Sequence, residues 1–278
     1  MTDPTAGSLR VNGATLHYEV RGHGPLLLLI PGGSGGAASF GDVADDLASE
    51  YTVATYDPRG MSRSALDDPE AEQRVAEHAD DALRILDLLS PGEPARVFGV
   101  SSGAIAALHL LTAHPERVER VVAHEPPAVL VLPDAADHRD LIARVQETFR
   151  TQGLVPAMAV FAEGLKKDGD TAEPKAGTEL PPQAAARAEQ TMANLPYFVG
   201  RIVPSFMSYI PDTNRLEALS DQLVLAGGQD SHGELAYRSA ALLAERLGME
   251  LLHFPGGHTG LTTHPAQFGE RLRKAFRV

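Results

Sequence analysis

The sequence predicts an α/β protein in which helices flank a mostly parallel β-sheet. Short apolar runs alternate with longer segments of helical periodicity, which is the pattern of repeated strand–helix–strand units. The central runs, such as "LLLLI" at 26–30, are apolar throughout, as expected for strands buried on both faces of a sheet. One long segment, 127–213, breaks this alternation and contains only helix-like pieces.

The strands follow in chain order. Residues 15–20 alternate polar and apolar side chains, so we expect them to form an antiparallel edge hairpin with residues 8–12. The other strands are expected at 26–30, 52–57, 96–101, 120–125, 222–227 and 250–255.

Helical patterns fill the spaces between these strands. Apolar residues recur at helical spacing with charged residues on the opposite face, and the first such set is Val75, Ala79, Ala82, Leu83, Leu86 and Leu89. Further helices are expected at 103–113, 234–247 and 265–276. We therefore divide the chain into a core domain, formed by 1–126 and 214–278, and an inserted helical cap at 127–213. Ligands of open α/β sheets bind outside the carboxyl ends of the strands, so a cap there would cover a binding site.

Composition limits the classes of function. The 278 residues are enough for one large domain with an insertion. Lys and Arg number 24 against 37 Asp and Glu, and the formal net charge of −13 disfavours nucleic acids and anionic membranes as partners. The chain has no cysteine, which excludes disulfides, thiolate metal sites and a cysteine nucleophile.

No targeting feature is visible in the sequence. The first residues lack a basic segment followed by an apolar one, and the longest apolar run, 25–31, is too short to span a bilayer. We expect a cytoplasmic protein that acts on a small molecule, with homo-oligomerisation left open.

The motif with the clearest chemistry is "GVSSG" at 99–103, which matches G-x-S-x-G. A predicted strand precedes it and a predicted helix follows it, which is the setting of a nucleophile on a sharp strand-to-helix turn. In this register Ser101 supplies the nucleophilic hydroxyl. Ser102 follows it, and its backbone N–H is expected to stabilise a developing oxyanion.

A serine nucleophile needs a base, and the base needs an acid that orients it. His258 lies in a Gly-rich loop three residues past a predicted strand, and Asp230 follows the preceding strand. We predict Ser101, His258 and Asp230 as the catalytic triad, with Glu125, at the end of the strand at 120–125, as the second candidate for the acid. The other histidines close to these strand ends are expected to be structural or to lie on the loop surface: His232, His253 and His264.

The Gly-rich loop "IPGGSGGAASF" at 30–40 also follows a predicted strand. It lacks the G-K-[ST] ending of a phosphate-binding P-loop, so an oxyanion hole is the better interpretation. We assign its donor to the backbone N–H of Gly33, with the neighbouring Ser34 as the alternative. The turn at 56–64 carries Asp57, Arg59 and Ser64, and these residues are expected to fix the turn.

The cap is expected to form an apolar part of the pocket wall, because aromatic residues and methionines gather there. The predicted substrate-binding residues are Ser34, Met158, Phe161, Tyr197, Phe198 and Phe206.

Taken together, the chain resembles the α/β-hydrolase fold superfamily over essentially its whole length. The motifs that carry the resemblance are "PGGSGG", "DPRGMSRS", "GVSSG", "HEPP", "GGQD" and "GGHTGLTTHP". The resemblance implies an eight-stranded, mostly parallel sheet with a cap and a Ser–His–Asp triad. The sequence has Pro31 where that family usually has histidine, although the backbone donor beside it is retained. A serine nucleophile in place of aspartate argues against haloalkane dehalogenase or epoxide hydrolase chemistry.

The sequence therefore predicts a serine hydrolase that cleaves a small-to-medium, partly apolar ester or lactone through an acyl-enzyme on Ser101. We expect no organic cofactor and no metal. Two alternatives remain: the same triad could cleave a C–C bond beside a ketone or an amide, or the fold could serve as a ligand-binding protein without turnover.

Overall fold

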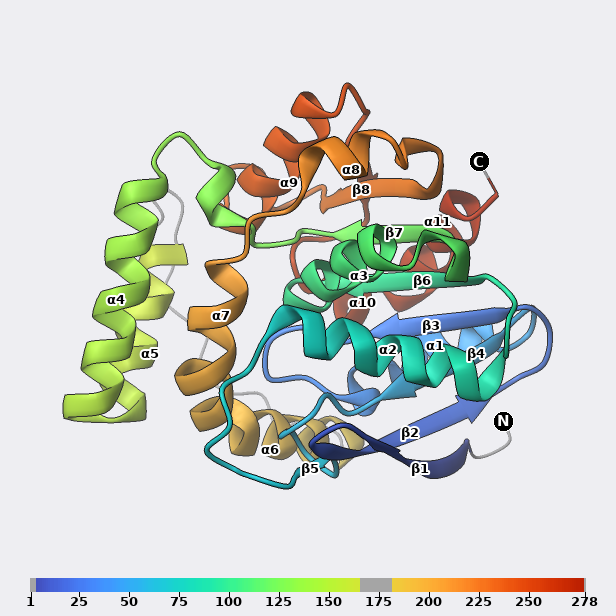
Figure 1. The fold of residues 1–278 in the computed structure, drawn as a ribbon, viewed down its shortest axis with the longest axis horizontal. Helices are drawn as coiled ribbons and strands as arrows, with labels where there is room; N and C mark the ends of the chain where they lie inside the picture. Colours follow the sequence, from blue (N-terminus) through green and yellow to red (C-terminus); the bar gives the residue numbers. More distant parts are fainter. Residues whose placement is uncertain (1–3, 166–181, 278) are drawn as a thin grey trace.

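The computed structural model describes residues 4–165 and 182–277, and these residues contain a nine-stranded mixed sheet. Eight strands lie side by side in the order β1-β2-β4-β3-β6-β7-β8-β9 (Figure 1). Their bounds are β1 Thr5–Val11, β2 Ala14–Arg21, β3 Leu26–Ile30, β4 Thr52–Tyr56, β6 Ala95–Val100, β7 Val118–His124, β8 Leu223–Gly228 and β9 Leu252–Phe254.

The pairing confirms the predicted mostly parallel sheet. From β4 to β9 every neighbouring pair along the path is parallel, whereas β1 and β2 form the expected antiparallel hairpin. Strand β2 also pairs antiparallel with β4, which joins the hairpin to the sheet. The ninth strand, β5 (Ala65–Leu66), pairs with β2 and was not expected, because two residues are too few to show a periodic pattern.

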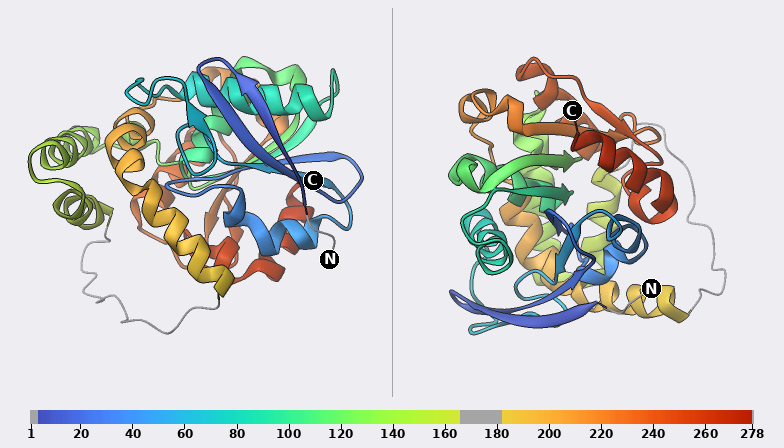
Figure 2. Two further views of the ribbon diagram at one scale, coloured as in Figure 1. Left: turned by 90° about the horizontal axis from the view of Figure 1, so that it is seen from below. Right: turned by 90° about the vertical axis from the view of Figure 1, so that its right-hand side faces the viewer.

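Helices cover both faces of the sheet, and the apolar strands contact both layers. All five residues of β3 are buried, and their side chains alternate between two hydrophobic clusters. Leu28 packs with helices α2 (Val75–Leu89) and α3 (Ser102–Ala113), and Leu29 packs with α1 (Gly41–Leu47) and α11 (Pro265–Ala275). Figure 2 shows these layers from two further sides.

A helical insertion separates β7 from β8. It comprises α4 (Ala135–Gln152), α5 (Leu154–Leu165), α6 (Pro182–Tyr197), a π-helical segment Phe198–Ile202 and α7 (Val203–Met207). Its described part contains no strand, as the sequence indicates. In Figure 1, α4 and α5 lie together at the left, and α7 lies between them and the sheet. The bounds 127–213 for a cap domain, and 1–126 with 214–278 for the core, stay predictions.

The remaining helices lie along the chain after the insertion. They are α8 (Thr213–Glu217), α9 (Leu235–Arg246) and α10 (Gly260–Thr263). Within the described ranges, none of the helices is both long enough and apolar enough to cross a bilayer.

The turn at 56–64 is held by polar contacts, as predicted. The Arg59 guanidinium pairs with the Asp81 carboxylate at 2.6 Å, and both side chains are buried. Asp57 accepts a hydrogen bond of 2.9 Å from the backbone N–H of Ala37, and the Ser64 hydroxyl donates to the Asp57 carbonyl at 2.6 Å. The bond from Ala37 fastens the turn after β4 to the segment after β3, and the Arg59–Asp81 pair fastens the turn to α2.

Candidate active site

Ser101 lies on a strained turn between β6 and α3. Its φ of 55° and ψ of −124° lie outside the helical and extended regions that a serine normally adopts. Glycine is required on both sides: a Cβ atom on Gly99 would be 2.4 Å from the Gly103 carbonyl oxygen, and one on Gly103 would be 2.3 Å from the Ile30 carbonyl oxygen. The Ser101 N–H donates to the His124 carbonyl of β7 at 2.9 Å. The turn is therefore anchored to the neighbouring strand.

The imidazole of His258 is bonded to a carboxylate, and that carboxylate belongs to Glu125. The distance from His258 Nδ1 to Glu125 Oε2 is 2.5 Å. Glu125 is fully buried, whereas the His258 side chain keeps 35% of its surface exposed. A histidine bonded through Nδ1 to a buried carboxylate has Nε2 free to act as a base.

The Glu125 carboxylate is held by three groups. Besides His258, the Gly228 N–H donates to Oε1 at 2.8 Å, and the Ser231 hydroxyl donates to the same atom at 2.5 Å. Burial raises the pKa of Glu125, but the hydrogen bond from His258, the charges of the two nearby histidines and the Ser231 hydroxyl outweigh burial and lower this pKa below its ordinary value. Glu125 is thus held as the anion.

His124, the residue before Glu125, does not carry a charge at neutral pH. His124 is fully buried, and burial lowers the pKa of its imidazole to about 4. The imidazole of His124 is therefore neutral at pH 7.

Among the described residues, Asp230, the predicted orienting acid, is not bonded to His258. Asp230 is exposed, and within the described residues its carboxylate makes no hydrogen bond or ion pair. Glu125 follows β7, which lies directly beside the strand that precedes Ser101, and the Gly228 N–H and the Ser231 hydroxyl hold its carboxylate where it bonds His258. Asp230 follows β8, and its side chain is exposed instead. Glu125 was the second candidate from the sequence.

The three rival histidines make other contacts. The Tyr237 hydroxyl lies 2.9 Å from Nε2 of His253, and His232 is exposed. His264 precedes α11 and contacts the Thr263 hydroxyl through Nδ1 at 2.9 Å. Among the described residues, none of the three histidines is hydrogen-bonded to Ser101 or Glu125.

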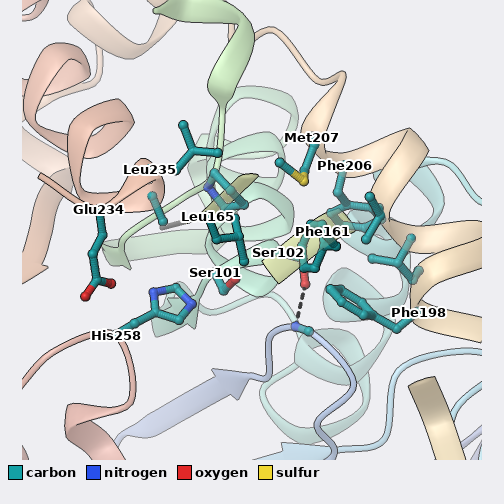
Figure 3. Close-up of a pocket in the computed structure, with 15 residues that line it drawn as sticks. Ser101, Ser102, Phe161, Leu165, Phe198, Phe206, Met207, Glu234, Leu235 and His258 are labelled. Atoms are coloured by element: carbon teal, nitrogen blue, oxygen red, sulfur yellow. Dashed lines mark hydrogen bonds between the residues drawn. The ribbon is translucent and has the colours of Figure 1, made fainter. Parts of the chain in front are cut away.

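The predicted oxyanion loop differs from expectation in one hydrogen bond. The Gly33 N–H, predicted as an oxyanion donor, donates to the Ser102 hydroxyl at 2.9 Å, shown as the dashed line in Figure 3. In contrast, the N–H of Ser34 makes no hydrogen bond within the described part of the chain. The Ser102 N–H begins α3 and so has no acceptor within the helix. Ser34, the alternative to Gly33, is therefore the better candidate for the second donor.

Ser101 and His258 lie side by side at the end of a cavity of about 270 Å³ (Figure 3). The wall is mostly apolar and comes largely from the helical insertion. Its apolar side chains are those of Pro127, Phe161, Leu165, Phe198, Ile202, Val203, Phe206, Met207, Leu235 and Ala236. A second cavity of about 270 Å³ also reaches Ser101 and His258, and several hydroxyl-bearing residues line it: Ser34, Ser39, Thr191, Thr259 and Thr262.

Four of the six predicted substrate-binding residues line one of these two cavities. Phe161, Phe198 and Phe206 line the apolar cavity, and Ser34 lines the hydroxyl-bearing one. The other two are placed elsewhere. Met158 packs into the hydrophobic cluster of the insertion, and the Tyr197 ring lies against Gly60, where a Cβ atom would be 2.2 Å from Cζ.

Sequence reasoning missed Ser231 and much of the cavity wall. Ser231 has no motif of its own, although its position one residue after Asp230 could have drawn attention to the hydroxyl. The aliphatic wall residues, such as Ile202 and Val203, carry the same helical pattern as core residues, so the sequence does not distinguish the two roles.

Comparison with known proteins decides the family. The sequence model of the α/β hydrolase fold matches residues 25–264. The chain belongs to the α/β hydrolase family. This α/β hydrolase is 37% identical over 273 residues to the uncharacterized hydrolase YraK of Bacillus subtilis strain 168, an alignment that covers 96% of this chain and 94% of YraK.

Two further proteins are similar to this α/β hydrolase. A zearalenone hydrolase of Cladophialophora bantiana is 26% identical over 273 residues, which are 97% of this chain and 95% of that protein. The structure of a thermophilic esterase from Thermogutta terrifontis superposes with a TM-score of 0.75 at 17% identity, covering 99% of this chain and 98% of the esterase. At that identity the superposition shows the shared fold alone.

Proposed function

We propose that this α/β hydrolase is a serine hydrolase that cleaves an ester or lactone through an acyl-enzyme on Ser101. The observation that supports it most is the bond of 2.5 Å between His258 Nδ1 and the buried Glu125 carboxylate. It lies beside a serine on a strained strand-to-helix turn. We therefore propose Ser101, His258 and Glu125 as the catalytic triad, with Glu125 in place of Asp230.

In the proposed reaction, His258 Nε2 removes the proton of the Ser101 hydroxyl, and Ser101 Oγ attacks the substrate carbonyl carbon. Glu125 keeps the proton on Nδ1 and stabilises the imidazolium that forms. The backbone N–H groups of Ser102 and Ser34 donate to the carbonyl oxygen as it becomes negative. His258 then gives its proton to the leaving alcohol, and water hydrolyses the acyl-enzyme through the same base.

The cavities support a small-to-medium, partly apolar substrate. The apolar cavity of about 270 Å³ is slightly below the range of about 300–1,000 Å³ typical of small-molecule sites, so it suits a small or medium apolar group. Among the described residues that line it, Glu234 is the only one with an acidic side chain. The acyl and alkoxy parts of an ester meet at the carbonyl group, and the hydroxyl-bearing cavity that also reaches Ser101 provides room for the second part. Zearalenone, which names one relative, is a natural compound to test under this proposal.

The experiment combines turnover with covalent labelling. We expect the wild-type protein to hydrolyse p-nitrophenyl butyrate and to take up one equivalent of a fluorophosphonate on Ser101. Ser101→Ala should lower kcat by about 10⁴–10⁶-fold and abolish labelling, because the attacking oxygen is removed. Near-normal turnover by Ser101→Ala would end the proposal.

The same assay separates the two alternatives from the sequence. Turnover of a vinylogous diketone or an anilide in preference to the ester would identify cleavage of a C–C or amide bond. A folded wild-type protein that is neither labelled nor active on any of these compounds would be a ligand-binding protein.

A further inference from the structure

A side chain of the insertion reaches the loop beside Ser101. Asn194 belongs to the last turn of α6, and only 6% of its surface is exposed. Its Nδ2 donates to the carbonyl oxygen of Ser34 at 2.8 Å. Asn194 and Ser34 are 160 residues apart in the sequence, so this bond joins the helical insertion to the loop after β3.

The same amide holds a second loop. Asn194 Nδ2 also donates to the Ser62 hydroxyl at 2.9 Å, and Asn194 Oδ1 accepts from the Ser62 N–H at 2.9 Å. Both N–H groups and the oxygen of the Asn194 amide are thus used. Ser62 has a φ of 52°, a conformation that is unfavourable for a non-glycine residue and that persists only where neighbouring contacts hold it.

The bond to Ser34 acts on the backbone that faces the nucleophile. Residues 32–35 form a turn in which the Gly35 N–H donates to the Gly32 carbonyl at 3.0 Å. The N–H and the C=O of Ser34 lie on either side of one Cα atom, so fixing the direction of the C=O restricts the direction of the N–H. The Ser34 N–H has no acceptor within the described residues.

We propose that Asn194 is a positioning residue, through which helix α6 holds the Ser34 backbone in the orientation that stabilises the transition state. This inference rests on the proposed serine hydrolase function. Phe198, one helical turn after Asn194, lines the apolar cavity, so the segment that contacts substrate and the segment that holds the loop are continuous. Preorganised donors contribute to kcat more than to substrate binding, because they are aimed at charge that develops during the reaction.

The test replaces the amide without changing its size. Asn194→Asp keeps the shape but removes both N–H donors, so the Ser34 carbonyl loses its partner. We expect kcat for p-nitrophenyl butyrate to fall about 10–100-fold while KM changes less than about 3-fold. The affinity for a trifluoromethyl ketone, which forms a tetrahedral adduct with the serine, should fall in parallel with kcat.

Two further variants make the result specific. Met192→Ala, on the same helix and 62% exposed, should leave kcat and KM unchanged. Ser62→Ala removes one partner of Asn194 but retains the bond to Ser34, so its effect on kcat should be much smaller than that of Asn194→Asp. Equal losses from both variants would mean that Asn194 only docks the helix, and would overturn the proposal.

The failure of this inference can be told apart from the failure of the proposed function. If wild-type protein hydrolyses the ester and is labelled at Ser101 while Asn194→Asp keeps its kcat, only the positioning role is wrong. If wild-type protein is neither active nor labelled, the proposed function itself is wrong. Circular dichroism and thermal unfolding show whether each variant is folded. If Asn194→Asp unfolds, Asn194→Ala replaces it and is judged in the same way, by comparing the change in kcat with the change in KM.

Discussion

Replacing Glu125 by glutamine tests the triad most directly. In the structure, Glu125 Oε1 accepts hydrogen bonds from the Gly228 N–H and the Ser231 hydroxyl, and Oε2 contacts His258 Nδ1. A glutamine in this position keeps its oxygen on the two donors, because its NH₂ group cannot accept from them. The NH₂ group then points at His258 Nδ1 and forces that nitrogen to be the acceptor. The proton moves to Nε2, which can no longer remove the Ser101 proton.

The expected loss follows from this change of tautomer. An asparagine in the orienting position of a serine-protease triad, which reverses the tautomer in the same way, lowers kcat about 10⁴-fold. We expect Glu125→Gln to lower kcat by about 10³–10⁴-fold, or about 4–5.5 kcal/mol of transition-state stabilisation at about 1.4 kcal/mol for each factor of ten. Asp230→Asn is the matched control, because its carboxylate is exposed and makes no contact within the described residues. It should remain within about 2-fold of wild type.

The assay is steady-state hydrolysis of p-nitrophenyl butyrate, with circular dichroism and urea unfolding to confirm that both variants are folded. A larger loss in Asp230→Asn than in Glu125→Gln would refute the assignment of Glu125 and restore Asp230. The double variant Glu125→Gln/Asp230→Asn checks one further case. If the loop after β8 moves in Glu125→Gln so that Asp230 takes the place of Glu125, the double variant should lose more activity than the two single losses predict together.

Three further predictions follow from the same contacts. Ser231→Ala removes one of three hydrogen bonds to a buried carboxylate, so urea unfolding should show a loss of about 1–3 kcal/mol. Ser102→Ala removes the hydroxyl that accepts from the Gly33 N–H but keeps the backbone N–H at position 102, so kcat should stay within about 3-fold of wild type. A loss close to that of Ser101→Ala would mean that Ser102 is the nucleophile. The pKa of Glu125 in the folded state is lowered from 4.5, so the stability that this carboxylate contributes is present above pH 4.5 and is lost as the pH falls through the lowered pKa. The difference in unfolding free energy between wild type and Glu125→Gln should therefore shrink below pH 4.5. Urea unfolding at several pH values measures this difference.

The sheet could be predicted from the sequence because burial on two faces leaves a strong signal. Strands such as β3 contact helices on both sides, so all their residues are apolar, and a polar substitution would be costly on either face. The hairpin of β1 and β2 shows alternation because part of it is exposed. The sharp turn at Ser101 was also predictable, because glycine is required on both sides of it. A Cβ atom on Gly99 or on Gly103 would lie within 2.5 Å of a backbone carbonyl oxygen.

The acid of the site was harder to predict, because two carboxylates follow predicted strands. The sequence favoured Asp230 and left Glu125 as the second candidate. The two differ in their contacts, which no pattern reveals: the Glu125 carboxylate is buried and bonded to His258, whereas the Asp230 side chain is exposed. The positive φ of Glu125, 49°, is a second feature that only the structure reveals, and it marks a residue whose conformation is imposed by its surroundings.

The loop after β8 nevertheless retains a part in the site. Although Asp230 is exposed, the Gly228 N–H and the Ser231 hydroxyl from the same short segment both donate to Glu125. The loop that was predicted to supply the anion instead supplies the donors that stabilise an anion on the neighbouring strand. An acidic side chain is visible in a sequence, whereas a backbone N–H is present at nearly every residue and carries no signal. The sequence therefore draws attention to this loop but not to the bonds that it makes with Glu125. The same limit applies to the Ser34 backbone, whose carbonyl oxygen is bonded by a side chain 160 residues away.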